Sequence, residues 1–250
     1  MRHTMQTILV AFSLLITALS HPTKSPSWTS LAPIPIPRQE HTTVFLPPST
    51  LAVLGGIIPI ISNSTLPIIT TPLVQLYSIL NNTWMHSAPL PRAMNHINAA
   101  VVDGDIYVLG GLADLNETQP AWRGVGDSFV YSSTSGEWEV LPELPAGEAR
   151  GSAAVGVYGS KIFLVGGMTD LELSGNAIQN SVKVVSVFDT KRRQWLDVPH
   201  KAKYLPEARD HAAAGVVDGK MYVLGGRDQG QEHVKDTVFI LNLRNLESGW

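Results

Sequence analysis

Two markers recur along this chain with nearly the same period. Four Gly-Gly pairs begin 55, 56 and 59 residues apart, and five of the six tryptophans lie 56, 54, 57 and 55 residues apart. The glycine pairs are Gly55-Gly56, Gly110-Gly111, Gly166-Gly167 and Gly225-Gly226. The tryptophans are Trp28, Trp84, Trp138, Trp195 and Trp250. Because two independent markers share one period, the sequence predicts an array of repeats that stack on one another.

Each repeat contains a strand, a tight turn and a second strand that ends at the glycine pair. Residues 101–111 read VVDGDIYVLGG and residues 216–226 read VVDGKMYVLGG, so nine of eleven positions are identical. The turns Asp103-Gly104 and Asp218-Gly219 indicate type I′, and Gly159-Ser160 suits type II′. The second strand is apolar without alternation, which predicts that both its faces are covered. Glycine at its end allows positive φ and the close approach of another backbone segment.

A variable loop and two further strands are expected to complete each repeat. The third strands are expected at Leu73–Ile79, Ser128–Tyr131, Val182–Phe188 and Asp236–Leu241. The recurring Trp opens the fourth strand, and seven residues before it stand Tyr77, Tyr131, Phe188 and, in the last repeat, Leu243. Four antiparallel strands make a twisted sheet that cannot cover both of its faces alone. Radial stacking of such sheets predicts an all-β propeller.

The order of Gly-Gly, an aromatic residue, Trp, Leu-Pro and an Arg/His pair resembles the kelch repeat from Trp28 to Trp250. The resemblance implies four repeats of four-stranded antiparallel blades in one kelch-type β-propeller domain, residues 21–250. The fourth repeat stops at Trp250, before its last strand. Two arrangements fit. Either residues 28–33 supply that strand and close a four-blade ring, or the chain is a shortened form of a larger propeller, since propellers have about four to eight blades.

The first twenty residues have the form of a secretory signal peptide. Arg2 precedes an apolar run from Ile8 to Leu19, and Ala18 and Ser20 are small residues at the expected cleavage site. No later segment is long and apolar enough to span a membrane, so the sequence predicts a secreted protein. Three Asn-x-Ser/Thr triplets are then expected glycosylation sites in surface loops. They begin at Asn63, Asn81 and Asn116.

Composition and motifs exclude several classes of function. The net charge is −3, and there is no basic stripe of the kind that a nucleic-acid partner requires. The chain has no cysteine, so the Tyr–Cys copper cofactor of galactose-oxidase-like and glyoxal-oxidase-like proteins cannot form. The Glu-x3-Asp-x3-His iron triad of nitrile-specifier-like kelch proteins is missing, and His86, His200 and His233 lack metal-ligand spacing. We therefore expect no metal and no cofactor.

Arginine and histidine recur where one repeat passes to the next. A histidine, or Ser152 in the third repeat, stands fourteen residues before each glycine pair. In a propeller these connections share one face with the loops after Gly-Gly, which predicts a polar mouth that binds a ligand. The recurrence at matching repeat positions favours a structural interpretation instead, in which the same side chains tie neighbouring blades together by hydrogen bonds. The candidate ligand-binding residues are Arg38, His41, Arg92, His96, Arg150, Arg209 and His211.

The sequence shows no catalytic constellation, so the leading hypothesis is a noncatalytic module that binds a protein or a glycan. The alternative is a carbohydrate-active enzyme of the sialate-mutarotase or epimerase type, in which a Glu and an Arg lie inside the ring mouth. Glu148 with Arg150, or Glu207 with Arg209, would supply such a pair. Conversion of a sugar anomer would distinguish the enzyme from the binding module.

Overall fold

A computed structural model of the 250-residue chain describes residues 27–59, 68–114, 121–172 and 179–250. Contacts divide the chain into two units, Met1–Leu31 and Ala32–Trp250. The described residues form β-strands and one 3₁₀ helix, η1 (Leu246–Ser248), which confirms the all-β prediction. Over these ranges no helix is long and apolar enough to cross a membrane. The expected signal peptide and the triplets at Asn63 and Asn116 lie outside the described residues.

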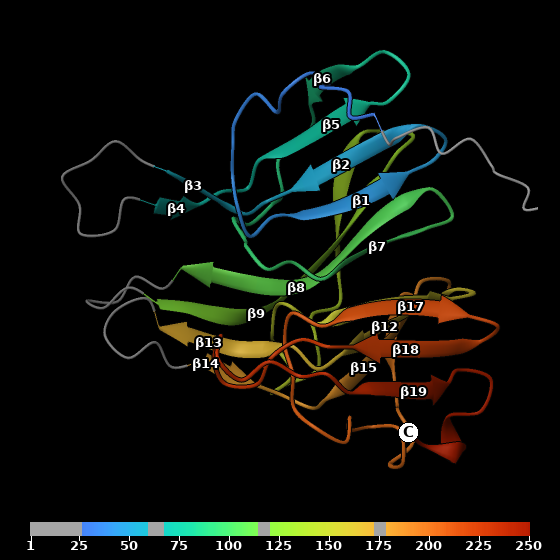
Figure 1. The fold of residues 1–250 in the computed structure, drawn as a ribbon. Helices are drawn as coiled ribbons and strands as arrows, with labels where there is room; N and C mark the ends of the chain where they lie inside the picture. Colours follow the sequence, from blue (N-terminus) through green and yellow to red (C-terminus); the bar gives the residue numbers. More distant parts are fainter. Residues whose placement is uncertain (1–26, 60–67, 115–120, 173–178) are drawn as a thin grey trace, which may run out of the picture. The chain divides into compact units, whose positions relative to one another are not determined.

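Four antiparallel sheets follow one another along the chain, one for each repeat (Figure 1). The first contains β1 (Thr42–Leu46), β2 (Thr50–Leu54), β5 (Val74–Ser78) and β6 (Thr83–His86). The second contains β7 (Ala99–Val102), β8 (Asp105–Asp114), β9 (Ala121–Ser132) and β10 (Glu137–Leu141). The third contains β11 (Ala154–Tyr158), β12 (Lys161–Val165), β15 (Val185–Asp189) and β16 (Gln194–Leu196). The fourth contains β17 (Ala213–Val217), β18 (Lys220–Leu224) and β19 (Val238–Asn242).

Consecutive sheets pack against one another and share buried apolar clusters. The first strands are neighbours in order: β1 lies beside β7 (Figure 1), β7 beside β11 and β11 beside β17. Removal of apolar surface from water stabilises such an interface by about 25 cal/mol per Å². Residue pairs that belong to the same cluster across these interfaces are Leu54 and Ile106, Val102 and Ile162, and Phe163 and Met221. This packing of antiparallel sheets confirms the β-propeller prediction, although the fourth sheet has three strands where four were expected.

The hairpins between the first two strands of each sheet adopt the turns that the sequence predicts. Asp103 and Gly104 have φ of 52° and 88°, and the matching pair in the fourth repeat has 50° and 70°, as type I′ turns require. In the third repeat Gly159 has φ of 58°, as the first central residue of a type II′ turn requires. The first hairpin is longer, because residues 47–49 connect β1 to β2 where the other hairpins use two residues.

The glycine pairs lie between two consecutive connections of the chain. Gly167 has φ of 109°, and a Cβ atom there would lie 2.6 Å from the carbonyl oxygen of Gly151, in the connection before the third sheet. A Cβ atom on Gly166 would collide with the carbonyl oxygen of Arg209, in the next connection. This pair is therefore a narrow wedge that only glycine can form, and Gly56 and Gly226 meet backbone carbonyl oxygens equally closely, which confirms the predicted close approach of backbone.

The recurring tryptophans attach each sheet to the one before it. Their indole N–H groups donate to carbonyl oxygens just beyond the preceding sheet's last strand, at 2.9 to 3.1 Å. The donor and acceptor pairs are Trp84 and Ala32, Trp138 and Ala88, Trp195 and Pro142, and Trp250 and Ala202. In the first three sheets the indole also packs on the predicted aromatic residue, with ring centroids 4.9 to 5.1 Å apart.

Residues 28–33 do not form the closing strand, which was one of the two arrangements that the sequence left open. These residues form no strand, and Trp28 is 97% exposed. Ala32 is bound instead to the first sheet, because its N–H donates to Asn82 Oδ1 at 2.7 Å and its carbonyl accepts from Trp84. Ala32 thus accepts the hydrogen bond from the first sheet's tryptophan, as a residue beyond the preceding sheet does in each later repeat.

Antiparallel arms stand where the sequence predicts variable loops after the glycine pairs. In the first repeat the arm consists of β3 (Ile57–Pro59) and β4 (Ile68–Thr70), and in the third of β13 (Met168–Glu172) and β14 (Gln179–Ser181). In the second repeat β8 and β9 themselves continue beyond the glycines. Because β13 pairs with β9, the second and third arms form one continuous sheet (Figure 1).

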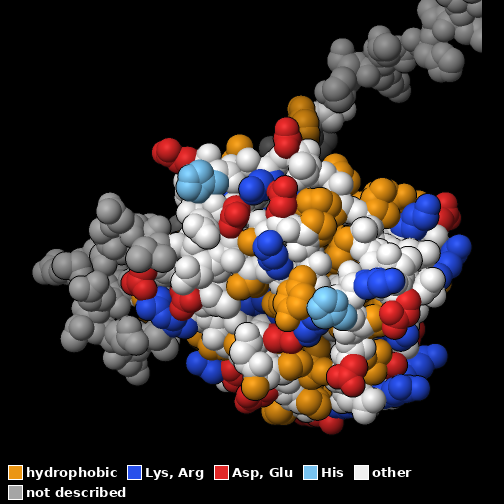
Figure 2. Space-filling model, turned by 90° about the horizontal axis from the view of Figure 1, so that it is seen from below, with side chains coloured by type: hydrophobic (Ala, Val, Ile, Leu, Met, Phe, Trp, Pro, Cys, Tyr) orange, Lys and Arg blue, Asp and Glu red, His pale blue; other side chains and the backbone are white. Residues whose placement is uncertain are grey.

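The fourth sheet has several apolar side chains exposed to solvent. Val217, Leu224, Val238 and Ile240 are between 41% and 59% exposed. Figure 2 views the molecule from the side on which β19 lies and shows hydrophobic side chains interspersed with charged ones. Exposed apolar side chains contribute little to stability, so these four add little to the burial that stabilises this sheet.

Candidate functional site

One residue in each connection between sheets has a left-handed backbone conformation, which is uncommon outside glycine. These residues, which we call the mouth residues, are Glu40, His96, Ser152 and His211, with φ of 52°, 50°, 56° and 51°. The backbone N–H of each of the last three donates to the carbonyl oxygen of the one before, at 3.0, 2.7 and 3.2 Å. These hydrogen bonds line up four side chains from four different repeats.

The mouth residues line a cavity of about 350 Å³. Small and apolar side chains from the first strands form the rest of its lining, among them Ala99 and Val155. The isolated bridges that Gln39, Asn95, Gly151 and Asp210 make with the residues just after the glycine pairs place the connections and the arms on one face. A cavity of this size, lined by apolar side chains and a few polar groups, is typical of a ligand-binding site.

The structure shifts one candidate mouth residue by a single position. The fourteen-residue spacing points to His41, but Glu40 has the left-handed backbone and accepts the hydrogen bond from His96. The longer β1–β2 turn adds one residue to the first repeat, which explains the shift. His41 is exposed and lines the cavity beside Glu40.

The arginines of the connections lie behind the mouth. Arg150 and Arg209 are fully buried, and their guanidinium groups donate to backbone carbonyls beside the glycine pairs, such as that of Gly166 at 2.6 Å from Arg150 Nε. Burial lowers the pKa of Arg150 to about 10. Arg38 is partly buried and donates to the carbonyl oxygen of Leu73 at 2.8 Å. These groups hold strand ends in place and do not face the cavity.

The remaining candidates lie apart from the cavity. Arg92 is exposed and forms an ion pair with Asp127 at 2.5 Å, because Met94 occupies the arginine position of the second connection. Glu148 binds Lys203 at 2.5 Å, and Glu207 accepts from the buried Arg209 at 3.2 Å. Neither glutamate is among the residues that line the cavity.

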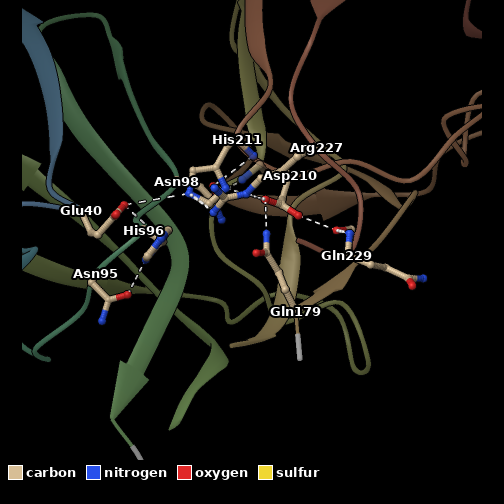
Figure 3. Close-up of polar contacts among 12 residues, drawn as sticks. Glu40, Asn95, His96, Asn98, Gln179, Asp210, His211, Arg227 and Gln229 are labelled. Carbon is tan, nitrogen blue, oxygen red and sulfur yellow. Dashed lines mark hydrogen bonds and ion pairs between the residues drawn. The ribbon is translucent and has the colours of Figure 1, made fainter. Parts of the chain in front are cut away.

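Asp210 is a fully buried carboxylate directly behind His211. It accepts hydrogen bonds at 2.5 Å from Gln179 Nε2, Ser181 Oγ and His211 Nδ1 (Figure 3). Burial raises the pKa of Asp210, but these hydrogen bonds outweigh burial and leave its pKa below the ordinary value. The third arm, which supplies Gln179 and Ser181, thereby fixes the ring of His211.

Glu40 and His96 form a second polar pair beside the first (Figure 3). Glu40 Oε2 lies 3.1 Å from His96 Nε2, and His96 Nδ1 lies 2.6 Å from Asn95 Oδ1. The hydrogen bond from His96 lowers the pKa of Glu40, whereas burial lowers the pKa of His96. The two rings His96 and His211 meet edge to face, with centroids 5.1 Å apart. Carboxylate and imidazole groups from three repeats therefore converge at one point, and these groups are also common metal ligands.

The repeats can now be compared with those of known proteins. The kelch motif family matches residues 94–145, 149–201 and 208–247, which is more than half of the chain. The chain belongs to the kelch-repeat family. In this kelch-repeat chain the matched segments contain three of the four glycine pairs, the indole donors Trp138 and Trp195, and three of the four mouth residues.

Relatives of this kelch-repeat chain occur in fungi and animals. Kelch-like protein terF of Aspergillus terreus is 39% identical over 225 residues, or 88% of this chain and 47% of terF. Kelch repeat and BTB domain-containing protein 12 of Homo sapiens is 27% identical over 72% of this chain and 29% of its own length. Alpha-scruin of Limulus polyphemus is 25% identical over 82% of this chain and 20% of its own length. The chain thus spans less than half the length of each of these relatives.

Sequence reasoning missed Glu40 and Asp210 as members of the site. The pattern Arg-x-mouth residue would have found Glu40, since Arg38, Arg150 and Arg209 each stand two positions before a mouth residue. No sequence pattern around Asp210 marks it as part of the site, because its hydrogen-bond partners Gln179 and Ser181 come from the arm of another repeat.

Proposed function

We propose that this chain is a secreted, N-glycosylated, noncatalytic kelch propeller that binds a protein ligand at its mouth. Kelch repeats indicate a protein-binding propeller module. The proposal rests on how the mouth residues are held in place. Hydrogen bonds join their backbones to one another, and the buried Asp210 binds the His211 ring. Polar groups that are fixed before binding lose little conformational entropy when a partner docks.

The mouth presents groups of both charges. Glu40 and Arg227 have side chains that are 40% and 20% exposed, and His211 between them is 28% exposed. The arms add a further charged cluster, in which Arg123 pairs with Asp170 at 3.2 Å and Glu172 at 2.6 Å. A surface with both charges around a small cavity favours a partner loop that inserts a polar side chain.

Secretion and glycosylation are supported by the sequence of the first twenty residues and by the position of Asn81. Asn81 is exposed in the turn between β5 and β6. That turn lies at the end of β5 that is distant from the glycine pair, since Ser78 pairs with Thr50 and Val74 with Leu54. A glycan at Asn81 would therefore leave the mouth free.

A comparison of three proteins tests the proposal. The wild type, a mouth variant (Glu40→Gln with Arg227→Gln) and a control (His86→Gln, on the exposed end of β6) are immobilised and incubated with secreted proteins of the source organism. Quantitative mass spectrometry should recover a partner with the wild type and the control, and not with the mouth variant. The partner, produced separately, should then bind in the same order in a direct titration.

Three results would overturn the proposal. Equal recovery of the partner by all three proteins would place binding outside the mouth. Binding to a glycan array, abolished in the mouth variant and without any protein partner, would indicate a lectin. Conversion of a sugar anomer that depends on Glu207 would indicate the carbohydrate enzyme. Mass spectrometry of Asn81 before and after glycosidase treatment tests glycosylation separately.

A further inference from the structure

Three side chains from three repeats bring metal-ligating atoms together at the mouth. One ligand atom each of Glu40, His96 and His211 lies within 4.8 Å of the other two. Glu40 Oε2 is 3.1 Å from His96 Nε2 and 4.0 Å from His211 Nε2. Ligands bonded to one Zn²⁺ at about 2.0 to 2.2 Å lie roughly 3 to 3.5 Å apart in tetrahedral geometry. Small side-chain movements would therefore bring all three atoms to bonding distance from one ion.

Both imidazole rings are held with Nε2 turned toward the shared point. His211 Nδ1 binds the buried Asp210, which is itself fixed by the third arm. His96 Nδ1 binds Asn95 Oδ1, and Asn95 Nδ2 donates to Thr70 Oγ1 at 2.8 Å, which sets the orientation of the amide. A hydrogen bond from Nδ1 to an oxygen is the arrangement that orients histidine ligands in metal sites.

The contacts of His96 are compatible with a cation at Nε2. Its two ring nitrogens each face an oxygen, Asn95 Oδ1 on one side and Glu40 Oε2 on the other. A neutral imidazole has one N–H, so it can donate to only one of them. A proton on Nε2 donates to Glu40 Oε2, whereas the Nε2 lone pair can bind a cation that the same carboxylate oxygen also binds.

We propose that Glu40, His96 and His211 form a binding site for a divalent transition-metal ion of the Zn²⁺ class. Two imidazoles and one carboxylate suit Zn²⁺ and its neighbours, whereas Ca²⁺ and Mg²⁺ prefer oxygen ligands throughout. Structural zinc sites have four protein ligands, and sites with three keep a position open. The open position here faces the 350 Å³ cavity, where water or a carboxylate can complete the coordination. The site stands independently of any protein partner.

Arg227 competes with the ion for one of the ligands. Its Nη2 donates to His211 Nε2 at 3.3 Å, while its Nε lies 3.3 Å from Asp210 Oδ1. Binding of a cation requires the guanidinium to leave His211 and places two positive charges near one another. Loss of the Arg227 charge should therefore strengthen metal binding. If the cluster is only a structural salt-bridge network, the same substitution weakens it instead.

Titration of purified, metal-free protein with Zn²⁺ in competition with a chromophoric chelator tests the site. The wild type should bind one equivalent. Glu40→Gln, which preserves shape, should weaken binding by about tenfold or more, and Asp210→Asn by about 10- to 100-fold. Arg227→Gln should bind Zn²⁺ more tightly than the wild type. His200→Ala, which removes an exposed histidine elsewhere, should leave the affinity unchanged.

Co²⁺ serves as a second probe, because its visible spectrum reports the coordination geometry directly. The band of nitrogen- and oxygen-bound Co²⁺ should develop in the wild type and in His200→Ala and be lost in Glu40→Gln. Circular dichroism of each variant shows whether it is folded. The proposal is overturned if the wild type fails to compete with the chelator, or if folded Glu40→Gln binds Zn²⁺ as tightly as His200→Ala does.

Discussion

The second glycine of each pair sets how closely the arm and the connection of one repeat approach each other. Gly167 combines two constraints that are usually seen apart: a left-handed backbone and a carbonyl oxygen at the position where a side chain would begin. Gly147 has the first constraint alone, since its φ is 80° and a Cβ atom there would meet nothing within 4 Å. The two residues therefore separate conformational strain from steric collision.

We predict that Gly167→Ala destabilises the protein well beyond Gly147→Ala. Alanine in the left-handed region costs about 1 to 2 kcal/mol at either position, and at Gly167 the collision with the carbonyl oxygen of Gly151 adds to this cost. Urea denaturation of both variants and the wild type measures the difference in the free energy of unfolding. Equal losses at the two positions would show that the wedge is not sterically tight.

The elements of each sheet are attached to the preceding sheet by a single repeated contact. The indole N–H of Trp138 donates to the carbonyl oxygen of Ala88 at 3.0 Å, and its ring packs on Tyr131. The same contact in four repeats shows that the tryptophan marks a junction between sheets rather than the centre of one core. Trp28 belongs to the same series in the sequence but is 97% exposed.

We expect Trp138→Phe to lower the free energy of unfolding by about 1 kcal/mol, since one partly buried hydrogen bond is lost while an aromatic ring remains. Trp28→Phe is the matched control and should leave stability unchanged, because Trp28 is exposed. Thermal unfolding followed by circular dichroism measures both. A comparable loss in the two variants would contradict the assigned role of the indole N–H.

Local signals in the sequence predict the elements within a repeat, but not those that depend on a second repeat. The type I′ turn at Asp103-Gly104 is set by two adjacent residues, so it could be predicted. The pairing of β9 with β13 joins two repeats, and neither strand has a sequence pattern from which the other could be predicted as its partner. Glu40 was missed because the β1–β2 turn has one extra residue, so the fourteen-residue spacing before the glycine pair pointed to the next residue instead.

At the scale of the whole molecule, stability is distributed between neighbouring sheets. The buried clusters lie between the first and second, second and third, and third and fourth sheets. Outside the mouth, where side chains of the first, second and fourth repeats meet, each sheet packs on its neighbours, so stability is approximately a sum of local terms. The exposed apolar side chains of the fourth sheet add little to the local term of that sheet.

We predict that Met221→Ala loosens the fourth sheet selectively. Met221 is fully buried in the cluster between the third and fourth sheets, and truncation of a buried side chain to Ala costs about 2 to 5 kcal/mol. Hydrogen exchange should accelerate in β17, β18 and β19 and stay nearly unchanged in β1 and β2. Uniform acceleration throughout the chain would show instead that the sheets unfold as one cooperative unit.

The glycine wedges have a consequence for how the repeats of such a chain can diversify. At each wedge the atoms that meet are a glycine and a backbone carbonyl, so the junction does not depend on which side chain follows. The adjoining mouth position can therefore hold an acid, an imidazole or a hydroxyl without any change in the fit between repeats. Repeats joined in this way are interchangeable parts, and a ligand site can be assembled or altered one repeat at a time.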